Sequence, residues 1–252
     1  MTIRPSRFLS GAAAILLLGA CIPSAGTAAD ACGGELSARV PAAPVAGRGE
    51  TGLRLLKQQG ALLYVPSGYR PGRAMPLLVM LHGAGGDARH SMLLAGDHAE
   101  RLGFLVIAPK SRAATWDVVS GRRYGPDVSA LDSALREVFE AYSVDPARVA
   151  VAGFSDGATY ALALGRANGK LFSHVFAFAP GFLAPARKQG KPRIFISHGK
   201  SDRVLPIDDT GRRVVHDLTE AGYRVTYEEF PGGHEVPRRL AQRFFERLVA
   251  AP

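Results

Sequence analysis

The stretch RVAVAGFSDGATYALALGRAN, residues 148–168, joins an apolar run to a helical pattern through a serine flanked by glycines. The run Arg148–Ala152 is typical of a strand that is buried on both faces. The segment Gly157–Asn168 has the apolar spacing of a helix. Ser155 lies in the sharp turn between them, where the flanking glycines leave room for neighbouring backbone. This order predicts a strand, a strained turn and a helix, with the Ser155 hydroxyl exposed above a sheet.

The alternation of apolar runs and helical patterns continues on both sides of this unit. The predicted strands, apart from two short ones around Gly60, cover residues 76–81, 104–108, 148–152, 174–178, 193–197 and 224–230. The predicted helices cover residues 91–102, 128–142, 157–168, 210–221 and 236–248, with Asp127 placed to cap the second. This alternation predicts an α/β fold with a mostly parallel, doubly covered sheet. The gap between Phe178 and Arg193 is too short for an inserted lid domain, so we expect an open site at the carboxyl edge of the sheet.

The first thirty residues have the three-part layout of a secretory signal peptide. A positively charged start and an apolar segment at 11–20 are followed by small residues at 24–29. Two processing routes are open: cleavage after Ala29, or lipidation of Cys21 in the lipobox-like sequence LGAC. We therefore expect a signal peptide at 1–29, a leader or linker at 30–50 and a folded domain at 51–252. Export to the periplasm or the extracellular space follows, with a membrane anchor only through Cys21.

The cysteines and the charge limit the classes of partner. Cys21 and Cys32 are the only cysteines, and neither lies in a metal-binding spacing. Removal or acylation of Cys21 leaves Cys32 without a partner, so we expect no internal disulfide. The formal net charge is +9, and the basic residues are scattered. This favours a solvated, arginine-rich surface, or attraction to anionic surfaces such as lipid headgroups or acidic polysaccharide, over nucleic-acid binding.

A glycine-rich loop follows the predicted strand at 76–81. Its sequence is HGAGG at residues 82–86, and such small residues let backbone N–H groups point at a developing oxyanion. We expect the N–H groups of Ala84 and of Asp156, the residue after Ser155, to form an oxyanion hole. The alternative interpretation is an ordinary glycine-rich turn.

A candidate acid follows the predicted strand at 193–197. Asp202 lies just beyond that strand, where a carboxylate can orient an imidazole and stabilise its charged form. Asp208 and Asp209 are the rivals, but they are better placed to open the next helix, where negative charge suits the helix dipole.

A candidate base lies in the loop after the last predicted strand. His234 follows Gly232 and Gly233 there, and a flexible loop can bring its imidazole over the serine. His198, at the end of the preceding strand, is the second candidate. The order Ser155, Asp202, His234 agrees with α/β-hydrolases and differs from that of chymotrypsin and subtilisin.

The sequences GFSDG, LHGAGG, HGKSD and GGH resemble the corresponding motifs of the α/β-hydrolase superfamily over about residues 53–250. Within it, the lidless layout and YSVDPAR at 142–148 resemble two groups. One is the phospholipase/carboxylesterase group, which includes acyl-protein thioesterases. The other is the polyhydroxybutyrate-depolymerase-like esterases, which include feruloyl esterases. Residues 115–117 resemble the aromatic segment beside the acyl pocket in these groups, so Trp116 is a candidate pocket wall. The alternative is a loop residue packed on the core.

These motifs predict a serine esterase that cleaves carboxylic esters through an acyl-enzyme on Ser155, without a metal or organic cofactor. The substrate is a small or polymeric ester. Feruloyl esterase and polyester depolymerase are alternatives of the same fold, although secreted depolymerases often have more cysteines. A peptidase of this fold and a non-catalytic binding protein are the rivals. These motifs do not define the acyl group, the alcohol or the oligomeric state.

Overall fold

The computed structural model describes residues 33–58, 60–121 and 123–250. Eight strands form one sheet in the order β1-β2-β4-β3-β5-β6-β7-β8. The strands are β1 (Gly52–Leu55), β2 (Leu62–Val65), β3 (Met75–Leu81), β4 (Leu105–Ala108), β5 (Val144–Phe154), β6 (His174–Phe178), β7 (Arg193–Gly199) and β8 (Val225–Phe230). The pairs β1–β2 and β2–β4 are antiparallel, and every pair from β4 across to β8 is parallel. The prediction of a mostly parallel sheet is therefore confirmed.

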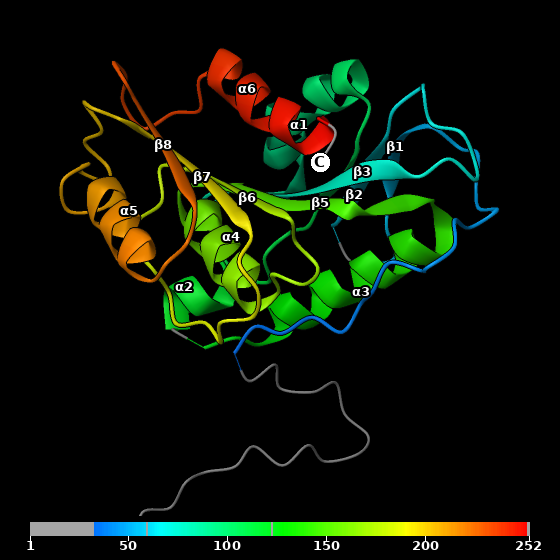
Figure 1. The fold of residues 1–252 in the computed structure, drawn as a ribbon, viewed down its shortest axis with the longest axis horizontal. Coiled ribbons are helices and arrows are strands. Elements are labelled where there is room, and N and C mark those ends of the chain that lie inside the picture. Colours follow the sequence, from blue (N-terminus) through cyan, green and yellow to red (C-terminus); the bar gives the residue numbers. More distant parts are fainter. Residues whose placement is uncertain (1–32, 59, 122, 251–252) are drawn as a thin grey trace, which may run out of the picture.

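Helices cover both faces of this sheet (Figure 1). On one face lie α1 (Ala88–Leu102) and α6 (Arg238–Val249). On the other lie α2 (Asp117–Gly121), α3 (Pro126–Ala141), α4 (Asp156–Ala167) and α5 (Gly211–Glu220). Each face has its own apolar cluster, and successive residues of β3 alternate between the two clusters. Burial on both faces explains why the central strands read as continuous apolar runs.

The described part of the predicted leader or linker at 30–50 is partly packed on the folded domain, because Leu36 and Ala38 are each only 2 % exposed. The Leu36 N–H donates to Asn168 Oδ1 at 2.7 Å, which ties this segment to the end of α4. Asp127 does not cap α3, since the N-cap residue is Gly125. The Asp127 carboxylate instead accepts the N–H groups of Arg112 and Asp117, each at 2.8 Å.

The predicted signal peptide at 1–29, with Cys21, lies outside the described residues, and so does Cys32. In the described part of the chain no helix has both the length and the apolar character needed to span a bilayer. The residues between β6 and β7 contain neither a helix nor a strand, so no lid domain is inserted there.

Candidate active site

Ser155 lies on the turn between β5 and α4, with φ 57° and ψ −121°. Positive φ is unfavourable for a residue with a side chain, so this backbone is strained. The neighbouring chains hold it in place, since the Ser155 N–H donates to Phe178 O at 2.9 Å. A Cβ on Gly153 would lie 2.1 Å from Gly157 O, and one on Gly157 would lie 2.4 Å from Leu81 O. The turn closes this tightly only because both flanking residues are glycines.

Three side chains from separate loops at this edge form one hydrogen-bonded chain. Ser155 follows β5, Asp202 follows β7 and His234 follows β8. His234 Nε2 lies 2.9 Å from Ser155 Oγ, and His234 Nδ1 lies 2.7 Å from Asp202 Oδ2. Because a carboxylate only accepts, Nδ1 carries the proton and Nε2 accepts the serine hydroxyl. The structure thus brings together the three residues that the sequence analysis selected.

The Asp202 carboxylate is fully buried but well satisfied. Its Oδ1 accepts the N–H groups of Val204 and Leu205, each at 2.9 Å, while Oδ2 accepts from His234. Burial alone would raise the pKa of Asp202. The Leu205 N–H, His234 and the Val204 N–H outweigh burial and lower that pKa below its ordinary value. Asp202 therefore remains a carboxylate that can face an imidazolium.

His198, the second candidate base, is brought to Asp202 rather than to the serine. Its ring is fully buried, and its Nε2–H donates to Leu205 O at 2.9 Å. The same nitrogen lies 3.1 Å from Asp202 Oδ2, the oxygen that His234 also contacts. The sequence analysis missed this contact. The spacing of four residues between His198 and Asp202 is the only signal in the sequence that could have suggested it.

The loop at 82–86 lies against the serine, since a Cβ on Gly83 would be 3.4 Å from Ser155 Cβ. The Ser111 N–H donates to His82 Nε2 at 3.0 Å, so His82 Nδ1 carries the proton and donates to Gly83 O at 2.8 Å. Burial lowers the pKa of His82, which keeps this ring neutral in that role. A neutral, doubly bonded His82 fixes the backbone of the loop.

The two predicted oxyanion donors belong to segments that meet at Ser155. Ala84 is in the loop whose Gly83 lies against the serine, and Asp156 is the first residue of α4. Within the described residues, neither N–H group donates to a protein acceptor. The Asp156 carboxylate does not accept from these two N–H groups, because its Oδ2 accepts from Thr115 Oγ1 at 2.6 Å.

The structure does not support Trp116 as a wall of the substrate pocket. Its side chain is only 1 % exposed. The indole stacks on Tyr160 at 5.1 Å, and its Nε1–H donates to His82 O at 2.8 Å. Trp116 therefore supports the glycine-rich loop from behind, which agrees with the alternative of a residue packed on the core.

Across the described residues, no group of three or more histidine, cysteine, aspartate and glutamate side chains is arranged to hold a metal ion. A mostly parallel sheet with a strained serine between β5 and α4 is the α/β-hydrolase fold.

Comparison with known proteins shows that the chain is similar to esterases. Residues 127–248 match the Phospholipase/Carboxylesterase family. The chain is 25 % identical over 191 residues to a probable feruloyl esterase C of Aspergillus oryzae, with 72 % of this chain and 68 % of that protein covered. It is 35 % identical over 101 residues to an acetylxylan esterase of Coprinopsis cinerea, covering 35 % and 25 % of the two chains. An S-formylglutathione hydrolase structure from Staphylococcus aureus superposes with a TM-score of 0.62 at 14 % identity, covering 83 % and 100 %.

The chain has the α/β-hydrolase fold and is a carboxylic ester hydrolase, similar over residues 127–248 to the Phospholipase/Carboxylesterase family.

Proposed function

We propose that this enzyme cleaves carboxylic esters in two steps through an acyl-enzyme on Ser155. As Ser155 Oγ attacks the ester carbonyl carbon, His234 Nε2 takes the hydroxyl proton and returns it to the departing alcohol. His234 then takes a proton from water as the water oxygen attacks the acyl carbon. The bond from that carbon to Ser155 Oγ breaks, His234 returns the proton to Oγ, and the acid leaves. Asp202 holds the imidazole in the correct tautomer and stabilises its charged form. The observation that carries this proposal is the chain of 2.9 and 2.7 Å contacts from Ser155 through His234 to Asp202.

The oxyanion of each tetrahedral intermediate needs donors that are already in place. We assign this role to the N–H groups of Ala84, next to Gly83 that lies against Ser155, and of Asp156, which follows Ser155; neither N–H donates to a protein acceptor in the described residues. Preorganised backbone donors of this kind contribute about 10²–10³-fold to the rate. The fixed ring of His82 and the buried Trp116 keep the Ala84 side of the hole rigid.

The test is replacement of the nucleophile. Ser155→Ala should lower kcat/KM for p-nitrophenyl acetate by about 10⁴-fold or more and abolish labelling by a fluorophosphonate probe. Ser133→Ala, on the exposed face of α3, is the matched control and should leave both unchanged. Retained hydrolysis or labelling in Ser155→Ala, with an unchanged circular dichroism spectrum, would contradict the assignment.

Two rival functions make different predictions in the same assays. A peptidase of this fold would cleave peptide p-nitroanilides at rates comparable to esters. A non-catalytic binding protein would bind ligands without reacting with the fluorophosphonate probe, because it has no activated serine. We expect ester cleavage and labelling, with negligible peptide cleavage.

An aromatic acyl group is the best candidate for the finer substrate class. The similar Aspergillus oryzae protein is named a probable feruloyl esterase. Two exposed apolar side chains lie in loops that follow strands at this edge of the sheet. Phe182 is 37 % exposed and follows β6, and Val204 is 65 % exposed beside Asp202. Such surfaces favour an aryl ring, and the absence of an element between β6 and β7 admits a bulky or polymeric alcohol.

A substrate panel tests this preference directly. Methyl ferulate should be cleaved with a higher kcat/KM than methyl butyrate, and Phe182→Ser should reduce that preference while leaving p-nitrophenyl acetate turnover nearly unchanged. A higher rate on a polyester film than on methyl ferulate would instead support the depolymerase alternative.

We also propose that the enzyme is exported, with residues 1–29 as its signal peptide. Cleavage after Ala29 would release it, whereas lipidation at Cys21 would anchor it. Expression of the full chain and of Cys21→Ser in a bacterial host, with labelled palmitate, separates the routes. Label and membrane association that disappear in Cys21→Ser identify the lipoprotein, and soluble, unlabelled protein in both identifies cleavage.

A further inference from the structure

A hollow opens at the amino edge of the sheet, at the opposite ends of the strands from Ser155. Its volume is about 540 Å³. It lies where β5 to β8 begin and where α6 ends, and we call it the amino-edge hollow. The residues that matter below are Arg148, Ser173, His174, Arg193, Arg224 and Arg247. Arginines from β5, β7 and α6, and from the residue before β8, therefore line one concave surface.

Most of the positive charge in this hollow is not balanced. Arg148 is paired with Asp145 at 2.6 Å. Arg193, Arg224 and Arg247 are exposed and, in the described ranges, have no carboxylate within ion-pair distance. Like charges gathered on one concave surface repel each other and raise the local concentration of anions. The hollow is thus prepared for negative charge from outside the described chain.

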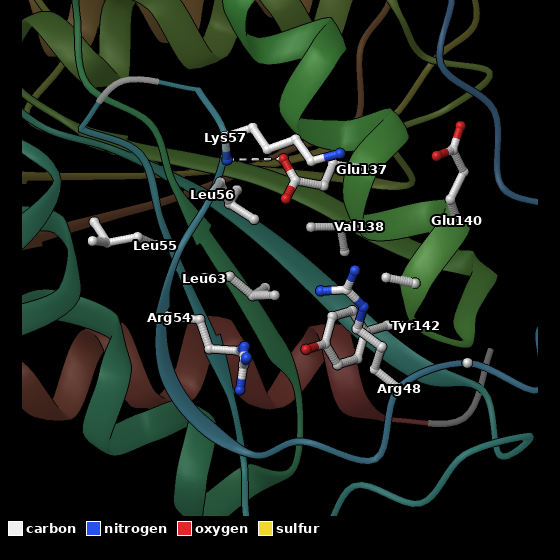
Figure 2. A pocket seen from close by; sticks show the side chains of 12 residues that line it. Arg48, Arg54, Leu55, Leu56, Lys57, Leu63, Glu137, Val138, Glu140 and Tyr142 are labelled. Atoms are coloured by element: carbon white, nitrogen blue, oxygen red, sulfur yellow. Dashed lines mark hydrogen bonds between the residues drawn. The ribbon is translucent and has the colours of Figure 1, made fainter.

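Another hollow shows that this imbalance is not general. A space of about 350 Å³ lies between residues 47–57 and α3 (Figure 2). There cations and carboxylates line the same hollow, since Arg48, Arg54 and Lys57 share its wall with Glu137 and Glu140. Glu137 accepts the Lys57 backbone N–H at 3.0 Å (Figure 2). The amino-edge hollow has no lining carboxylate at all among the described residues.

His174, in the wall of the amino-edge hollow, gives a second and independent indication of a ligand. It is only 7 % exposed. Ser173 Oγ donates to Val149 O at 3.1 Å, so it accepts from His174 Nδ1–H at 2.9 Å. His174 Nε2 is left buried without a hydrogen-bond partner in the described residues. An unpaired buried polar atom is unfavourable, and a ligand hydroxyl or a proton that accompanies an anion would satisfy it.

We propose that the amino-edge hollow binds a multivalent oxyanion, of the phosphate or the polycarboxylate type, at a site separate from the catalytic centre. Guanidinium groups bind both kinds of anion through paired N–H donors. Three arginines without ion-pair partners favour a ligand with more than one negative charge. Binding at this edge leaves the carboxyl edge, with Ser155, free to meet an ester.

The test is calorimetric titration of the whole enzyme with two probes, sodium pyrophosphate and tricarballylate, at low ionic strength. At least one probe should bind saturably with a stoichiometry of one. The double variant Arg193→Gln/Arg224→Gln should weaken that binding by at least about tenfold. Binding of one probe alone identifies the phosphate or the carboxylate source, and binding of both supports the shared chemistry.

Arg238→Gln/Arg243→Gln is the matched control, because it removes the same charge from α6 outside the hollow. These arginines pair with Asp97 and Glu228. The control should bind the probe as the wild type does, and both double variants should keep kcat/KM for p-nitrophenyl acetate within about twofold. Equal weakening in the two double variants would mean a general charge effect and overturn the proposal. So would the absence of saturable binding to either probe.

A single variant tests the proposal without removing any arginine, so its result does not depend on the folding of the double variant. Thr226 is exposed and lines the hollow, and Thr226→Glu adds a carboxylate there without removing an arginine. This variant should also weaken binding by about tenfold, because its carboxylate occupies the guanidinium groups. Unchanged affinity in Thr226→Glu would overturn the proposal.

Discussion

At the carboxyl edge of the sheet, the buried Asp202 carboxylate accepts two backbone N–H groups and the His234 N–H. At the amino edge, Arg193, Arg224 and Arg247 face no carboxylate within the described residues. A charge that the chain pairs internally is held in one geometry before any ligand arrives, as a proton relay needs. A charge that the chain leaves unpaired is available to a partner, as a binding site needs.

Backbone strain follows the same division. The two non-glycine residues with positive φ in the described chain, Ser155 at 57° and Ala179 at 51°, both follow strands at the carboxyl edge. Before β7 and β8, at the amino edge, positive φ occurs at Gly190 and Gly222. Strain is thus concentrated where the nucleophile must be lifted out of the sheet. The predictions below probe whether catalysis depends on the pairing and strain of one edge alone.

The largest effect is expected from Asp202→Asn. An amide can donate to His234 Nδ1 and favour the wrong tautomer, so kcat/KM for p-nitrophenyl acetate should fall by about 10³–10⁴-fold. Asp209→Asn, an exposed neighbour outside the hydrogen-bonded chain, is the control and should change little. A loss below about tenfold in Asp202→Asn would show that the pairing at this edge is not what orients the base.

A smaller effect is expected at His198, which we interpret as a positioning residue for Asp202. His198→Phe removes the Nε2–H that lies 3.1 Å from Asp202 Oδ2 and donates to Leu205 O. We expect a loss of about 10–100-fold in kcat with little change in KM, and a shifted acid limb of the pH–kcat profile. His198→Gln keeps a donor and should recover part of the rate.

His216→Phe, on the exposed face of α5, is the control for His198→Phe. A His198→Phe enzyme that loses stability but keeps its kcat and pH profile would reduce His198 to a packing role.

Local sequence was enough to predict the central strands, the helices other than α2, and the three hydrogen-bonded side chains of the candidate site. The apolar runs define the central strands, and Gly153 and Gly157 define the turn at Ser155, because these signals come from neighbouring residues. The packing of Leu36 was not predictable, since its partner Asn168 is 132 residues away. Burial of Trp116 likewise depends on Tyr160 and His82, which a motif comparison does not place. Contacts between distant segments are what the sequence pattern lacks.

The amino edge should govern stability rather than turnover, and His174 offers a pH test. Burial, with a smaller contribution from Arg193, lowers the pKa of His174 to about 4 from its ordinary 6.5. Between these values the unfolded chain binds a proton that the folded protein does not, so stability falls as pH drops from about 6.5 to 4. Arg148, Arg224 and Arg247 of the same hollow stay positive throughout this range, so they add no pH dependence of their own.

His174→Phe should therefore flatten this dependence. Between pH 7 and pH 4.5 the wild type should lose about 2 kcal/mol more unfolding free energy than the variant, as measured by urea titration. The exposed His216→Phe serves as the control and should keep the wild-type slope. Asp202 acts at more acidic pH, because a carboxylate with a lowered pKa loses its contribution only as pH falls below about 4. Equal slopes in wild type and His174→Phe would refute the assignment of this window to the amino edge.

The smallest effect concerns the strain at Ser155, which can be measured without any activity. Ser155→Gly and Ser155→Ala both remove the nucleophile, but only glycine adopts φ 57° and ψ −121° without a steric penalty. The glycine variant should therefore be more stable than the alanine variant by about 1 kcal/mol in urea unfolding, after the greater flexibility of an unfolded glycine is subtracted. At the amino edge no such gain is available, since the positive-φ positions before β7 and β8 are already glycines. If Ser155→Gly is the less stable of the two, the turn is not strained, and the nucleophile is lifted out of the sheet by its neighbours' packing alone.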